Sequence, residues 1–71
     1  MMTYMGWQIS DMKAPLPESI RHALNHYAKK YAEPPNVLEH SNLLSDVPNV
    51  DGVEFISISI PKNIFLIGVK R

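Results

Sequence analysis

The segment Ile64–Val69 is apolar at nearly every position, so a strand made from it carries large side chains on both faces. Such a strand is usually covered on both sides of its sheet. The chain has 71 residues, enough for one small domain, and it has no cysteine for a disulfide or a thiolate metal site. The sequence therefore predicts a single domain, residues 1–71, whose sheet needs cover on both faces.

A helical pattern spans residues 17–32, where apolar side chains recur at three- and four-residue spacing. The recurring residues are Ile20, Ala23, Leu24, Tyr27, Ala28 and Tyr31. Pro17 suits the first turn of a helix, and the proline pair that begins at Pro34 ends it. The spacing predicts an amphipathic helix that buries Leu24 and Tyr27 against the sheet.

Three stretches read as strands, namely residues 36–41, 53–60 and 64–69, because they are short, apolar or alternating, and bounded by turn residues. The connection at Pro61 is too short for a parallel crossover, which predicts a C-terminal antiparallel β-hairpin. Residues 1–10 also alternate, and they form either a further strand or an N-terminal arm. The predicted fold class is α+β, with one amphipathic helix packed on a small 3–4-stranded sheet.

The charges are balanced, with seven basic and seven acidic residues that form no blocks. A neutral domain lacks the electrostatic footprint that binding to nucleic acid or to an anionic membrane requires. The longest apolar run is far shorter than the ~20 residues that span a bilayer, and the start has no signal-peptide pattern. These features predict a cytoplasmic protein without a membrane segment. A small nucleic-acid-associated regulator that uses the polar face of the helix is the main alternative to a protein-binding role.

No motif in the sequence predicts a catalytic residue or a cofactor. None of the serines lies in a G-x-S-x-G signature, and the three glycines are too far apart for a phosphate-binding loop. The sequence therefore favours a non-enzymatic protein over an enzyme.

The histidines offer the one candidate metal site. His22 and His26 are four residues apart on the predicted helix, and Glu18 precedes them by one turn on the same face. A 2-His-1-carboxylate site for zinc or iron is one interpretation, which would make the protein a metal-binding module or an enzyme. The favoured interpretation is that all three side chains face water opposite the apolar stripe. His40 shares a strand face with Leu38 and is interpreted as a structural histidine.

The best-supported function from sequence is association with another protein. One helix can cover one face of a small sheet, and the other face would keep an apolar patch that monomers rarely leave exposed. The predicted partner is a second copy of the chain or another protein, and a homodimer is favoured because an unpaired edge strand can extend a sheet across a two-fold axis. The candidate interface residues are Phe65, Ile58, Ile56 and Trp7. The alternative is a monomer completed by Met5, Trp7 and Ile9.

Overall fold

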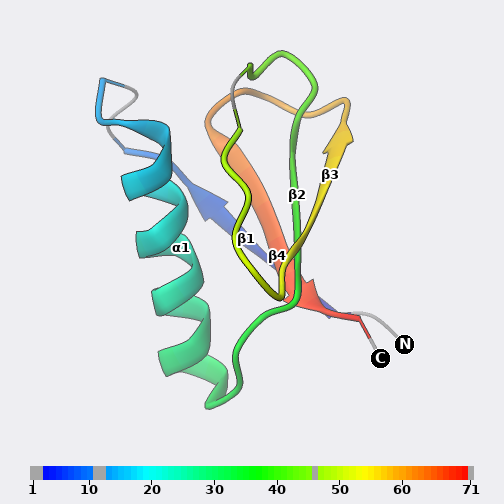
Figure 1. The fold of residues 1–71 in the computed structure, drawn as a ribbon. Helices are drawn as coiled ribbons and strands as arrows, with labels where there is room; N and C mark the ends of the chain where they lie inside the picture. The colour runs from blue at the N-terminus through cyan, green and yellow to red at the C-terminus, as the bar shows by residue number, and fades with distance from the viewer. Residues whose placement is uncertain (1–2, 11–12, 46, 71) are drawn as a thin grey trace.

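The computed structural model describes residues 3–10, 13–45 and 47–70. One helix packs on a four-stranded mixed sheet, so the predicted α+β class is confirmed (Figure 1). The elements in chain order are β1 (Thr3–Gln8), α1 (Leu16–Tyr31), β2 (Val37–Ser41), β3 (Glu54–Ile58) and β4 (Ile64–Val69). The N-terminal segment thus contributes a strand, one of the two alternatives that its alternation left open.

The strand order in the sheet is β1-β4-β2-β3. β4 pairs antiparallel with both β1 and β2, and β2 pairs parallel with β3. The consecutive strands β3 and β4 run antiparallel and are joined by a short loop, as the predicted hairpin requires. They are hairpin-like rather than directly paired, because β2 lies between them and hydrogen-bonds to both.

The helix begins and ends within one residue of its predicted bounds. Pro15 occupies the N-cap position and a second proline lies in the first turn, where a missing N–H costs no helical hydrogen bond. Glu18 in the first turn and two lysines in the last turn complement the helix dipole. The helix stops at Ala32, whose φ of 54° places it in the left-handed region ahead of the proline pair.

Ala32→Gly is expected to raise the free energy of unfolding by about 1 kcal/mol, because glycine adopts the left-handed C-cap conformation without the strain of a β-carbon. For a domain of this size that gain is a rise in Tm of about 4–8 °C. Thermal unfolding followed by circular dichroism measures it. The control is Ala28→Gly inside α1, which should lower the stability by about the same amount. Equal melting of both variants would contradict the role given to Ala32.

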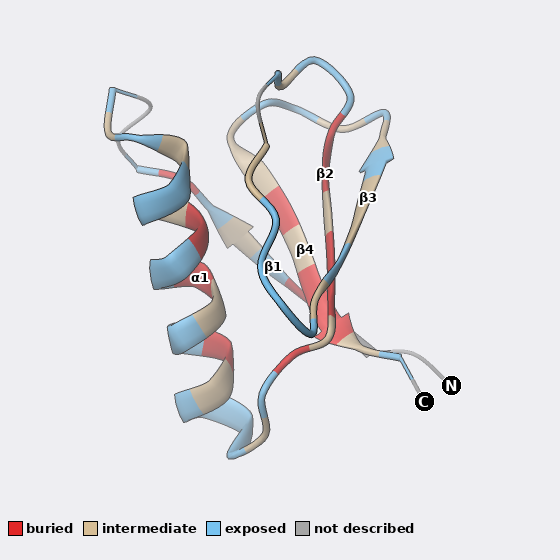
Figure 2. Ribbon diagram, viewed as in Figure 1, coloured by how far each residue is buried: buried red, intermediate tan, exposed pale blue. Residues whose placement is uncertain are grey.

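The core lies between α1 and one face of the sheet (Figure 2). Its buried members are Met5, Ile9, Ile20, Ala23, Tyr27, Leu38, Phe65 and Ile67. The expectation for the helix stripe is met at Tyr27, whereas Leu24 is only half-buried and Tyr31 is exposed. The part of the stripe that contacts the sheet most closely is therefore Ile20, Ala23 and Tyr27, with Leu24 at its margin.

Both long connections of the sheet lie on the α1 side. The first is α1 itself, and the second is described at residues 42–45 and 47–53, where Leu44, Val47 and Val53 pack against the same core. In the view of Figure 1, the described residues of this segment run on the helix side of β2 and β3. Among the described residues, neither connection crosses the opposite side of the sheet. That opposite side is called the open face below.

Candidate functional site

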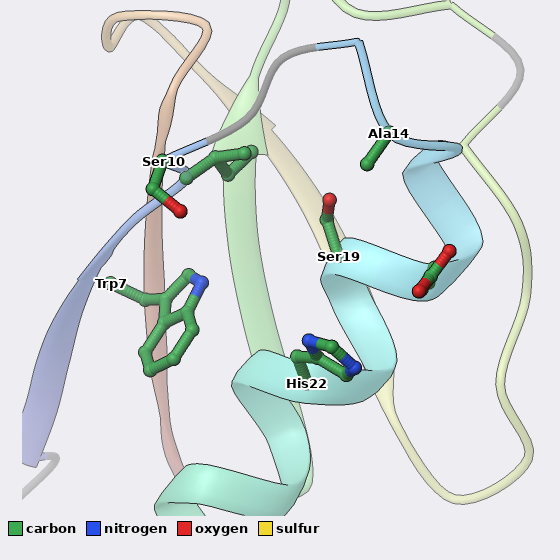
Figure 3. Close-up of a pocket in the computed structure, with 7 residues that line it drawn as sticks. Trp7, Ser10, Ala14, Ser19 and His22 are labelled. Atoms are coloured by element: carbon green, nitrogen blue, oxygen red, sulfur yellow. The ribbon is translucent and has the colours of Figure 1, made fainter.

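A hollow of about 260 Å³ lies between the end of β1 and the first half of α1. It is lined by Trp7, Ile9, Ser10, Ala14, Glu18, Ser19 and His22. Figure 3 shows Trp7 on the strand side of the hollow, with Ser19 and His22 facing it from the helix. The lining mixes one large aromatic ring with hydroxyl, imidazole and carboxylate groups.

A second hollow of about 330 Å³ adjoins the first and shares Trp7 and His22 with it. Its other lining residues are Asn25, His26 and Lys29. The indole ring of Trp7 contacts the imidazole of His26, with the ring centroids 4.9 Å apart and the planes at 51°. This contact ties β1 to the outer side of α1, and it gives His26 a packing role.

The three candidate metal ligands Glu18, His22 and His26 are exposed, as their position opposite the stripe predicted. Glu18 and His22 line the first hollow, while His22 and His26 line the second. Over the part of the chain that the structure describes, no three histidine or carboxylate side chains come close enough to hold a metal ion. The geometry therefore adds no support to the metal interpretation.

His40 lies inside the protein on the same strand face as Leu38, as predicted. Its Nδ1 is 3.0 Å from the backbone carbonyl oxygen of Ser41, which it can reach only as an N–H donor. Its ring also lies 6.4 Å from that of Phe55. These contacts satisfy the imidazole within the fold, which is what a structural histidine requires.

The four predicted interface residues fall in different places. Phe65 is 0% exposed beneath α1, so it cannot contact a partner, and its proposed interface role is corrected. Trp7 is half-buried against the helix. Ile56 and Ile58 are half-exposed on the open face of β3, where a partner can reach them.

The open face is defined by the side chains that alternate away from the helix-side core. Its described members with sizeable side chains are Tyr4, Gln8, Val37, Glu39, Glu54, Ile56, Ile58, Ile64 and Leu66. Among them Val37 is already buried by its neighbours. Ile64 and Leu66 are half-exposed there, on the strand that buries Phe65 and Ile67 on its other face. The two-sided character of β4 in the sequence thus corresponds to one covered and one uncovered face.

Glu39 stands in the middle of the open face and was not predicted as a site residue. In the sheet register it lies between Leu66 of β4 and Ile56 of β3, and its side chain is half-buried. The hydroxyl of Tyr4 donates a hydrogen bond to its carboxylate. Partial burial, this bond and the negative charges of Glu39 and Glu54 raise the pKa of the Tyr4 hydroxyl.

One end of the open face is polar. The Nζ atom of Lys70 is 3.8 Å from Oε1 of Glu54, and both side chains are 57% exposed. The Asn36 side chain accepts a hydrogen bond from the backbone N–H of Lys70 and donates one to its carbonyl. These bonds fix the backbone of Lys70, while its ammonium group remains near the surface in a weak ion pair.

β3 is an edge strand, because it pairs with β2 on one side only. The N–H of Glu54 donates to Asn36 and the carbonyl of Ile58 accepts from Asn42, so alternate residues starting at Glu54 direct their backbone groups toward β2. Phe55 and Ser57 consequently direct theirs outward. Within Glu54–Ile58 there is no proline, lysine or arginine, the residues that commonly prevent edge pairing.

Comparison with known proteins finds no matching family model, no matching curated protein and no matching solved structure. Within the described residues, no helix is long and apolar enough to cross a membrane.

Proposed function

We propose that the protein is a non-enzymatic assembly subunit that forms a homodimer through the exposed edge of β3. The observation that carries the proposal is the outward direction of the Phe55 and Ser57 backbone groups on an edge strand. Antiparallel pairing of two β3 strands would satisfy these groups and join two four-stranded sheets into one.

The pairing is centred on Ile56. A two-fold axis at this residue places Phe55 of each copy opposite Ser57 of the other, so both outward backbone groups of each chain gain a partner. The two Ile56 side chains then lie side by side on the open face, where directly opposed apolar pairs stabilise antiparallel strands. Glu39 lies on β2, so the two paired β3 strands separate the Glu39 carboxylate of one copy from that of the other, and the two carboxylates do not meet.

Sedimentation velocity from about 1 to 200 μM is the test, and the wild-type protein is expected to show a concentration-dependent dimer. Ser57→Pro removes only an outward N–H, so it should leave the parent sheet intact and abolish the dimer. Ile56→Lys should weaken the dimer by about 30-fold or more in Kd, because it opposes two like charges at the axis. The monomer should tolerate this substitution, because the new lysine lies beside Glu39 of its own chain.

Ser45→Pro, in the exposed segment after β2, is the matched control and should sediment like the wild type. Amide exchange gives a second measurement, since the Phe55 and Ser57 amides should become protected only at concentrations where the dimer forms. A wild-type protein that stays monomeric at 200 μM, or a Ser57→Pro variant that still dimerises, would show the proposal to be wrong.

A further inference from the structure

Glu39 is a half-buried charged group that lies between apolar side chains in the middle of the open face. Its neighbours across the strands are Leu66 and Ile56, and the next positions along the open face of β3 and β4 are Ile58 and Ile64. A solvent-exposed sheet face is normally polar, whereas Glu39 has these four apolar side chains on one side, with Gly68 and Glu54 at the next positions toward the polar end of the face. The arrangement combines an apolar contact surface with a carboxylate near its centre.

The carboxylate is held in place by the protein. The Tyr4 hydroxyl, on β1, donates a hydrogen bond to it across β4. The β4 residue paired with Tyr4 is Gly68, which has no side chain to block this contact. The hydrogen bond orients the carboxylate without neutralising its charge. Lys70 forms its ion pair with Glu54 at the polar end of the face, so that ion pair does not balance the charge of Glu39.

A partner that covers this face must supply a cation at Glu39. Contact with apolar side chains removes water from the carboxylate, and a desolvated charge without an opposite charge strongly opposes binding. Among the described residues of the open face, Glu39 and Glu54 outnumber Lys70, a balance of charge that disfavours phosphate-rich partners such as nucleic acid and anionic lipid.

We propose that the open face binds a polypeptide segment that presents a lysine or arginine flanked by apolar side chains. The cation pairs with Glu39, and the apolar side chains contact Leu66 and Ile64 on one side and Ile56 and Ile58 on the other. This surface shares only Ile56 with the proposed dimer contact, and the dimer uses the outward backbone groups of β3, so the face around Glu39 remains available in both the monomer and the proposed dimer.

The probe is a dye-labelled amphipathic 14-residue peptide of leucine and lysine, followed by fluorescence anisotropy. A leucine and glutamate peptide with the same apolar spacing is the comparison. We expect saturable binding of the lysine peptide and none of the glutamate peptide. Binding of both peptides, or of neither, would overturn the proposal.

Charge variants separate this site from general attraction. Glu39→Lys and Glu18→Lys change the net charge equally, but Glu18 lies exposed on α1. We expect Glu39→Lys to raise the Kd of the lysine peptide by about tenfold or more relative to Glu18→Lys. Glu39→Gln keeps the side-chain shape and should lose most of the same affinity, which covers the case in which Glu39→Lys fails to fold. Equal effects of the Glu39 and Glu18 variants would overturn the proposal.

The two proposals fail separately. Ser57→Pro should bind the lysine peptide as the wild type does, because its substitution lies on the outer edge and not on the open face. A variant that no longer dimerises but still binds the peptide would therefore support the peptide-binding proposal. A Ser57→Pro variant that folds but no longer binds the peptide would overturn it.

Discussion

Replacing Phe65 by alanine is expected to lower the free energy of unfolding by about 3–5 kcal/mol. Phe65 is 0% exposed, and its side chain on β4 lies in the core between α1 and the sheet. Removing the phenyl ring should therefore leave a cavity that neighbouring side chains do not fill. Small domains hold only about 5–15 kcal/mol in total, so the variant should be close to unfolding at 25 °C. Urea denaturation followed by circular dichroism measures the change.

Leu24→Ala is the comparison for this result. Sequence spacing predicted that Leu24 is buried against the sheet, with an expected cost of about 2–5 kcal/mol on substitution. In the structure Leu24 is half-buried, so its truncation removes less contact and opens a smaller cavity. The cost should therefore fall below that of Phe65→Ala, and the reverse order would mean that the packing described here is wrong.

Enlarging Ala23 to leucine is expected to destabilise the protein by about 1–3 kcal/mol, through overpacking instead of a cavity. Ala23 is 0% exposed on the helix surface that faces the sheet, so a larger side chain must push the helix outward. The helix propensities of alanine and leucine are close, so the change reports packing and not helix formation.

Arg21→Leu is the matched control for Ala23→Leu, because it introduces the same side chain at an exposed position of α1. It should leave the urea midpoint nearly unchanged. Fluorescence of Trp7, the single tryptophan, gives a second measurement because its ring contacts His26 on the same helix. If the two variants unfold alike, the close approach of α1 at Ala23 is refuted.

The sequence predicted those features that depend on local periodicity. The helix follows from apolar spacing and its proline boundaries, and the outward position of His22 follows from the same spacing. Alternation also placed Phe55 and Ile56 on opposite faces of their strand, and the structure turns Phe55 toward the core and Ile56 to the open face. Each of these predictions needs only residues that are close in the chain.

The sheet order could not be predicted, because it depends on contacts between distant segments. The short loop at Pro61 indicated that β3 and β4 run antiparallel, but not that β2 would lie between them. Alternation likewise showed that Phe65 and Leu66 face opposite sides of β4 without showing which side the helix covers. Assigning Phe65 to the interface was the consequence of that ambiguity.

The unusual position of Glu39 is visible in the sequence, within an otherwise uncharged strand. Glu39 is the single charged residue in the strand Val37–Ser41, and a charge inside a central strand requires a specific partner or a special location. Its importance depends on the neighbours Leu66 and Ile56, which only the register of three strands brings together.

The place of β4 in the sheet has a consequence for how the chain folds. β1 pairs only with β4, and β4 also joins β1 to the β2–β3 pair, so the strands from the two ends of the described chain lie next to each other. Most of the sheet therefore forms only when residues far apart in sequence come into contact. This requirement slows folding compared with a helical protein of equal length. The β2–β3 pair alone is too small to be stable in water, so partly folded forms gain little before β4 docks. Folding should then be a single cooperative step, with the amides of β4 opening only when the whole molecule unfolds.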